Sequence, residues 1–180
     1  MKLFFSFLLL LCCTLTAHAQ LEQGTWLVGG SGSYSHSKND NNTLFTTIHA
    51  NPRIGYFIAD KLSTGVQAMY TYQANDNGYN GGGIYSHSLL MGIFARYYIL
   101  KTEQIFNVLT EVSYNYGYSG IDGYYTIMSS GKHGYASIAV GPTLFVNSAI
   151  GLESTISYLY GNSQNQNWQL NLGINVYLFK

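Results

Sequence analysis

The chain has 180 residues, of which 9% are charged and 16% aromatic, with eight basic and eight acidic side chains and a formal net charge of zero. Soluble domains have roughly 25% charged residues, so this composition argues against an ordinary soluble domain. The 17 tyrosines argue against disorder, and the lack of a basic run leaves nucleic-acid binding without electrostatic support.

The N-terminal segment has the pattern of a cleaved signal peptide. Lys2 supplies a positive charge, residues 3–15 are almost all apolar, and Ala-His-Ala at 17–19 is the small-x-small pattern that signal peptidase recognises. The apolar run is shorter than the ~20 residues of a membrane-spanning helix. We therefore expect residues 1–19 to be a signal peptide and residues 20–180 to form one exported domain.

Both cysteines, Cys12 and Cys13, lie in that segment, so the mature chain cannot depend on disulfides. It has to be held together by burial or by a hydrogen-bonded ladder that closes on itself. Period-two alternation recurs along it and predicts eight strands. We expect these strands over residues 25–36, 44–57, 62–73, 84–99, 105–118, 133–146, 150–160 and 166–179.

The last strand has the clearest alternation, since Leu170, Leu172 and Ile174 alternate with Asn171 and Gly173. The third and seventh strands alternate in the same way. A soluble β-sandwich would also alternate, but apolar faces without surface charge indicate strands that face lipid. Most of the strands have the ~9–11 residues that a tilted transmembrane strand needs.

The joins between the expected strands alternate between long and short. Short joins are expected at 59–61, 100–104 and 147–149, and longer ones, rich in Gly, Asn, Ser and Asp, at 37–43, 74–83, 119–132 and 161–165. Outer-membrane barrels have short periplasmic turns and longer extracellular loops. The pattern therefore predicts an even-numbered barrel with both chain ends in the periplasm and four loops outside.

Aromatic residues are expected to form a girdle at each membrane interface, because amphipathic rings favour the headgroup level. Tyr56, Phe57, Tyr97 and Tyr98 lie beside short joins. Those beside the long joins are Tyr70, Tyr72, Tyr116, Tyr118, Tyr158 and Tyr160.

Four charged residues lie well inside the expected strands. Arg53, Arg96, Glu111 and Glu153 each fall on the polar face of their strand, within several residues of a short join. A lumen charge without a partner costs several kcal/mol of desolvation. The sequence therefore predicts a network of these four charges in the periplasmic half of the lumen.

His49 and Gln67 could extend this network. The interior of an eight-stranded barrel is just wide enough to be filled by side chains. We therefore interpret the four charges as a structural plug, and the alternatives are a gated polar path or an acid/base site.

Motifs at strand ends add a family resemblance. They are Asn-Pro-Arg-Ile-Gly-Tyr-Phe-Ile-Ala-Asp-Lys-Leu at 51–62, Phe-Ala-Arg-Tyr-Tyr at 94–98, Gly-Pro at 141–142 and Leu-Glu at 152–153. Over residues 25–179 the chain resembles the small outer-membrane β-barrel domain family, of OmpA/OmpX-like architecture. The resemblance implies an all-β, eight-stranded antiparallel up-and-down transmembrane β-barrel after a cleaved signal peptide, in the outer membrane of a Gram-negative bacterium.

Such barrels usually end on an aromatic residue that the outer-membrane assembly machinery reads, whereas here Phe179 is followed by Lys180. We expect that machinery to be a partner, together with outer-membrane lipid and lipopolysaccharide. A surface or host ligand bound through the loops is a further expected partner. The protein is expected to be a monomer.

Catalytic, cofactor and metal sites have little support in the sequence. No metal-binding spacing is present, and His87 between Ser86 and Ser88 is best interpreted as a polar residue at a strand end. The other mature histidines are His36, His49 and His133. We expect no catalytic, cofactor-binding or metal residues, and no enzymatic activity.

The sequence thus predicts an integral outer-membrane protein with a side-chain-filled lumen, exposed loops and a structural or surface-interaction role. One alternative is a narrow channel for small or hydrophobic solutes. A second is a lipid A-modifying barrel enzyme, and a third is a soluble lipocalin-like barrel.

Overall fold

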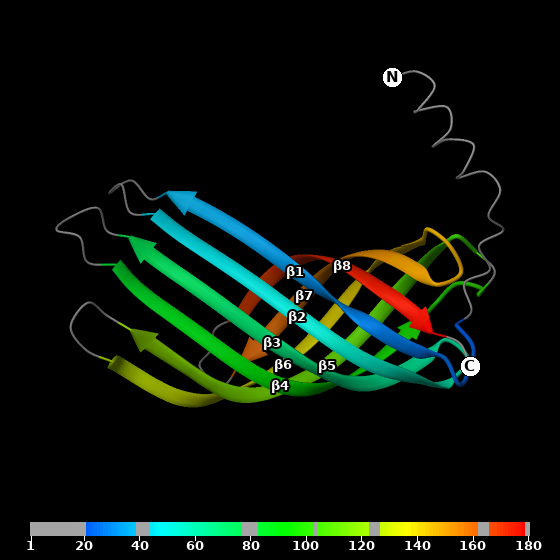
Figure 1. Cartoon of the computed structure of the whole chain (residues 1–180), viewed down its shortest axis with the longest axis horizontal. Coiled ribbons are helices and arrows are strands. Elements are labelled where there is room, and N and C mark those ends of the chain that lie inside the picture. Colours follow the sequence, from blue (N-terminus) through cyan, green and yellow to red (C-terminus); the bar gives the residue numbers. More distant parts are fainter. Residues whose placement is uncertain are drawn as a thin grey trace, which may run out of the picture.

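The computed structural model describes residues 21–38, 44–76, 83–102, 104–122, 127–161 and 166–178. Eight strands form a closed antiparallel barrel in which each strand pairs with its neighbours in sequence and β1 pairs with β8 (Figure 1). They are β1 (Trp26–Lys38), β2 (Leu44–Ala59), β3 (Leu62–Asp76), β4 (Gly83–Tyr98), β5 (Phe106–Asp122), β6 (Ile127–Phe145), β7 (Ile150–Gly161) and β8 (Gln166–Leu178). The expected fold class is confirmed, whereas the expected signal peptide at 1–19 lies outside the described residues.

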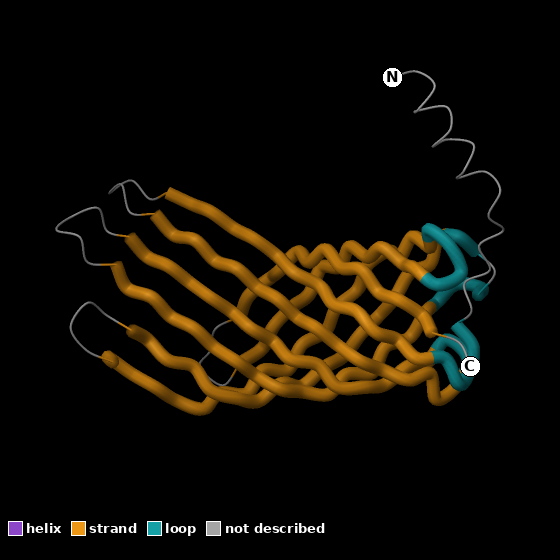
Figure 2. The backbone as a smooth tube through the Cα atoms, viewed as in Figure 1, coloured by secondary structure: helices purple, strands orange, loops and turns teal. Residues whose placement is uncertain are grey.

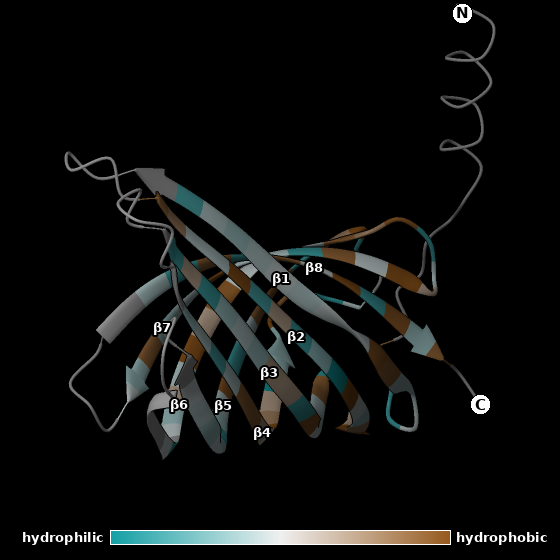
Figure 3. Cartoon of the chain, turned by 60° about the vertical axis from the view of Figure 1, so that its left-hand side comes forward, coloured by the Kyte–Doolittle hydropathy of each residue, from teal (hydrophilic) through white to brown (hydrophobic). Residues whose placement is uncertain are grey.

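Apolar and polar residues alternate along the strands, which gives the banding of hydropathy in Figure 3. The exposed set is mainly apolar, and most of the buried set above the short joins is polar. On β4 the outward residues from Leu89 to Tyr97 include no charged side chain, and Ile93 among them is 64% exposed. The outward residues of β5 from Phe106 to Tyr118 also lack charge. An exposed apolar belt around a closed barrel is the surface that a bilayer covers.

The short joins lie together at one end of the barrel (Figure 2). They cover residues 60–61, 99–105 and 146–149, and the first described residues and the end of β8 lie at the same end. In the tightest of them, Lys61 adopts a left-handed conformation with φ of 66°, which is common at turn positions. Among the residues that the structure describes, no helix is long and apolar enough to cross a membrane.

The barrel wall extends further than expected at the opposite end. Most of the expected join at 119–132 is paired strand, because β5 continues to Asp122 and β6 starts at Ile127, with Ser119 opposite Gly131. Ladder hydrogen bonds do not require an apolar face. Beyond the membrane both faces meet water, so the alternation that marked the strands in the sequence is lost there. The remaining parts of the long joins, at 39–43, 77–82, 123–126 and 162–165, lie outside the described residues.

Candidate functional site: the closed lumen

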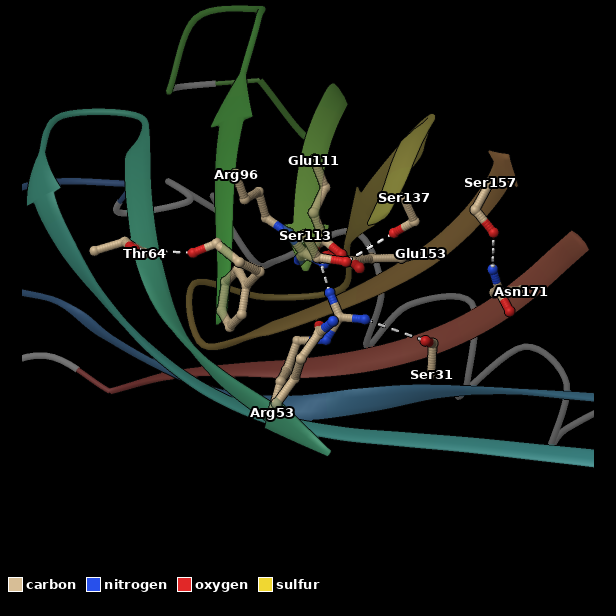
Figure 4. A network of polar contacts seen from close by, with 12 residues as sticks. Ser31, Arg53, Thr64, Arg96, Glu111, Ser113, Ser137, Glu153, Ser157 and Asn171 are labelled. Carbon is tan, nitrogen blue, oxygen red and sulfur yellow. Dashed lines mark hydrogen bonds and ion pairs between the residues drawn. The ribbon is translucent and has the colours of Figure 1, made fainter. Parts of the chain in front are cut away.

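Four charged side chains meet inside the barrel (Figure 4). Arg53 Nη1 lies 2.5 Å from Glu111 Oε2, and Arg96 Nη2 lies 2.7 Å from the same oxygen. Arg96 Nη1 lies 2.6 Å from Glu153 Oε1. The structure thus brings all four predicted residues together, and we call them the ion layer. Two positive and two negative charges compensate one another in a space that is almost closed to solvent.

Neighbouring groups hold the two arginines in place. Arg53 donates from Nη2 to Ser31 Oγ at 3.2 Å, and Arg96 donates from Nη1 to Tyr98 Oη at 3.2 Å. The Phe94 ring lies beside both guanidinium groups, with its centroid 5.6 Å from Arg53 Cζ and 6.0 Å from Arg96 Cζ. These cation–π contacts add to the ion pairs in fixing the layer.

An aromatic floor closes the lumen between the ion layer and the short joins. It consists of Phe57, Tyr98, Phe145 and Tyr177, each at most 2% exposed. Phe57 stacks on Tyr98 with ring centroids 5.9 Å apart, and Tyr98 Oη lies 2.8 Å from Tyr177 Oη. The same cluster contains Leu21, Leu27, Phe94 and Leu109.

The expected place of two of these rings was wrong. Phe57 and Tyr98 were expected in an interfacial girdle, but both are fully buried inside the barrel. Phe57 has the same strand parity as Arg53, and Tyr98 has the parity of Arg96, so alternation itself indicates that they face inward. Their sequence neighbours Tyr56 and Tyr97 do lie exposed on the outside, as expected.

The segment before β1 completes the floor, and sequence reasoning missed it. The Leu21 side chain is fully buried, and the Leu21 carbonyl accepts a 2.7 Å hydrogen bond from Lys61 N. Gln23 N donates to Asp60 Oδ1 at 2.9 Å, and Gly24 N donates to Phe57 O at 3.0 Å. No periodic signal could have identified this segment, because it is not a strand.

A polar layer lies next to the ion layer. Gln67 donates from Nε2 to Asn115 Oδ1 at 3.0 Å, and His49 Nδ1 lies 2.8 Å from Thr71 Oγ1. His49 and Gln67, which could have extended the ion network, hydrogen-bond within this layer. Further contacts of the same kind join Ser113 to Ser137 and Ser157 to Asn171, as Figure 4 shows.

Very little space remains at the level of the ion layer. The cavity that borders Arg53, Arg96, Glu111 and Glu153 has a volume of about 30 Å³, which is room for about one water molecule. Nearer the long joins the lumen widens into a hollow of about 330 Å³, which we call the outer vestibule. It is lined by residues that include His49, Met69, Thr71, Gln73, Ser88, Leu90 and Leu159.

Comparison with known proteins relates this geometry to a group of barrels. No protein-family model and no curated protein sequence matches the chain. In structure it is similar to Neisserial surface protein A (NspA), with a TM-score of 0.59 and 15% identity over 86% of this chain and 97% of that one. The chain has the fold of the small outer-membrane β-barrels.

Two further barrels support this assignment, and both come from Pseudomonas aeruginosa. The outer membrane protein OprG matches with a TM-score of 0.57 and 13% identity, over 92% of this chain and all of that one. The N-terminal β-barrel domain of OprF matches with a TM-score of 0.55 and 14% identity, over 87% of this chain and 98% of that one. The shared fold and the charge-free apolar belt together describe an integral outer-membrane barrel.

The histidines of this outer-membrane barrel lie at several places in the structure. Among the described residues, no three His, Cys, Asp or Glu side chains are grouped so that they could hold a metal ion. His36 Nδ1 lies 2.9 Å from Thr46 Oγ1. His87 is exposed, and its side chain leaves β4 on the opposite face from those of Ser86 and Ser88. The side chain of His133 lies outside the described residues.

Proposed function

We propose that this protein is a non-catalytic scaffold of the outer membrane whose sealed lumen supports loops presented at the cell surface. The observation that carries the proposal is that Arg96, Tyr98 and Tyr177 lie in contact inside the lumen, where each side chain is at most 1% exposed. Side chains that fill the lumen and bond across it favour a rigid wall over a path for solutes.

Partners of the scaffold follow from its surfaces. We propose that the apolar belt faces outer-membrane lipid, and that the barrel end opposite the short joins faces lipopolysaccharide and the outside of the cell. We propose that a surface or host ligand binds there, that the barrel is inserted by the outer-membrane assembly machinery, and that it acts as a monomer.

Epitope tags on intact cells test the proposed orientation. A tag inserted at Gly82, in a long join, should bind antibody on intact cells, whereas a tag at Ser148, in a short join, should bind only after the outer membrane is permeabilised. Heat-modifiable migration on a gel would show that both tagged proteins are folded. Antibody binding at Ser148 on intact cells would contradict the proposal.

The enzyme alternative has its own test. Lipid A extracted from cells with and without the gene should have the same mass spectrum if the barrel is a scaffold. A change in acyl or phosphate content that depends on the gene would overturn the non-catalytic part of the proposal.

A further inference from the structure

The pairing of β1 with β8, which closes the barrel, covers only part of the length of the two strands. β1 and β8 pair from Trp26 opposite Leu178 to Gly32 opposite Leu172 and no further. Both strands continue, since β1 pairs with β2 as far as Lys38 and β7 pairs with β8 down to Gln166. Figure 1 shows β1 running on past β8 toward the long joins. We call this opening in the wall, between residues 33–38 and 166–171, the β1–β8 gap.

A side-chain bond spans the gap, in which Gln169 Nε2 donates to Ser33 Oγ at 2.8 Å. Backbone N–H and C=O groups along a strand edge need polar partners, which hydrocarbon cannot supply but a polar headgroup or water can. In a complete ladder the two strands would satisfy one another. Here the strand edges that face the gap can instead bond to a polar molecule that lies between them.

The gap joins the inside of the barrel to the outside. A hollow of about 470 Å³ runs through it and is bordered both by inward-facing and by outward-facing side chains. It shares His49, Gln73 and Leu159 with the outer vestibule. On the outer side stand two aromatic rings, Trp168 at 74% exposed and Tyr34 at 68% exposed.

An apolar groove on the lipid-facing surface leads to the gap. Its hollow has a volume of about 660 Å³, and Gly30, Gly32 and Ala50 form a low floor beside Leu172 and Ile174 of β8. Gly32 and Leu172 also border a second hollow, of about 560 Å³, that reaches Ser33 and Leu170 in the gap. The groove lies toward the middle of the barrel, and the gap lies toward the long joins. Together they form one continuous depression whose inner end, the groove, is apolar and whose outer end, the gap, has polar side chains.

We propose that the groove and the gap bind one glycolipid of the outer leaflet, with an acyl chain in the groove and an uncharged sugar unit of its headgroup in the gap. The direction fits, because a lipid of that leaflet has its headgroup outermost; this part rests on the proposed orientation of the barrel. Ser33 and Gln169 offer hydrogen bonds to sugar hydroxyls, and Tyr34 and Trp168 offer flat faces to a sugar ring. Among the side chains that the structure describes, no Asp, Glu, Lys or Arg borders the hollow through the gap, which favours an uncharged sugar unit there.

A photoactivatable probe tests the site. The mature protein, refolded in a zwitterionic detergent, would be irradiated with dodecyl maltoside that has a diazirine on its sugar, and the labelled residues would be found by mass spectrometry. Labelling at Ser33, Trp168 and Gln169 should exceed labelling at Ile93 and Val112, on the other side of the barrel, by about tenfold. Equal labelling around the whole belt would overturn the inference.

A blocked variant shows whether the gap is the site. The mature chain has no cysteine after residue 19, so Ser33→Cys can be alkylated alone with a bulky maleimide. That adduct should reduce labelling of Trp168 about tenfold. The matched control is Ser88→Cys with the same adduct, on β4 and away from the gap, which should leave labelling unchanged.

The two variants replace Ser by a side chain of similar size, and heat-modifiable migration confirms that each is folded. Labelling of Trp168 that persists with the Ser33 adduct in place would overturn the inference. A conducting lumen would contradict the sealed scaffold but would leave selective labelling at the gap intact, so the two proposals fail separately.

Discussion

Arg96 on β4 donates to Glu153 on β7 at 2.6 Å, although these two strands share no ladder. The ion pair therefore ties one wall of the barrel to another directly across the lumen. Tyr98 Oη lies near both groups, 3.2 Å from Arg96 Nη1 and 3.5 Å from Glu153 Oε1, and also bonds to Tyr177. One continuous set of contacts thus links the ion layer to the aromatic floor.

Replacing Glu111 by leucine should destabilise the barrel strongly. Glu111 Oε2 accepts from Arg53 and from both Nε and Nη2 of Arg96, so the change leaves one buried arginine without its acidic partner. Loss of one partner of a buried ion pair costs about 3 to 5 kcal/mol. Equilibrium unfolding in detergent should show this decrease in the free energy of unfolding.

A double variant distinguishes the cost of an unpaired buried charge from the cost of a changed side-chain shape. Adding Arg53→Met to Glu111→Leu removes the unpaired cation and should recover part of the lost stability, because replacing a whole buried ion pair by apolar groups is often close to neutral. A silent Glu111→Leu variant would show that the ion layer is not structural.

Removal of the hydroxyl groups of Tyr98 and Tyr177 should change the free energy of unfolding in a non-additive way. Tyr98→Phe or Tyr177→Phe alone leaves the other buried hydroxyl without this partner, which costs about 1 to 3 kcal/mol. The double variant Tyr98→Phe/Tyr177→Phe should cost less than the sum of the two single changes. A double-mutant cycle in detergent measures the coupling, and strict additivity would show that the 2.8 Å contact contributes nothing.

Leu21 should matter as much as a core residue of a strand. Its side chain is fully buried in the floor, so Leu21→Ala should cost about 2 to 5 kcal/mol. Glu22→Ala is the matched control, because Glu22 lies in the same segment but is exposed. Thermal unfolding followed by gel migration would compare them, and equal midpoints would mean that this segment does not seal the barrel.

The alternation rule predicted the ion layer from the sequence because it depends only on parity within a strand. Period-two alternation predicts that the four charged side chains face inward, namely Arg53, Arg96, Glu111 and Glu153. The same alternation predicts the eight strands of the closed barrel. The expectation for Phe57 was wrong because nearness to a turn does not decide which face of a strand a ring lies on. Aromatic rings near a turn can face either lipid or lumen, and only parity distinguishes the two.

Other features depend on contacts that no local pattern encodes. Leu21 fills the floor from outside the strands, and its place is set by Phe57 and Tyr98 far along the chain. The incomplete pairing of β1 with β8 is set where the barrel closes, between residues more than a hundred positions apart. The register of that closure depends on the tilt of all eight strands, which a one-dimensional period does not contain.

The apolar belt predicts a cost for charge that depends on depth. Ile93 lies midway along the outward face of β4 and is exposed, so Ile93→Arg should cost about 2 to 4 kcal/mol when the barrel is folded into vesicles. Tyr85→Arg, at the outer end of the same strand, should cost about 0 to 1 kcal/mol. Equal costs at both positions would contradict the proposed position of the membrane.

The central claim is that side chains seal the lumen, and planar-bilayer recording tests it most directly. Purified barrel added to a bilayer should produce no unitary current steps, because Arg96, Tyr98 and Tyr177 are each at most 1% exposed inside the lumen and the cavity that borders Arg96 has a volume of about 30 Å³. Reproducible steps of one amplitude from folded wild-type protein would contradict the claim and would favour a narrow channel.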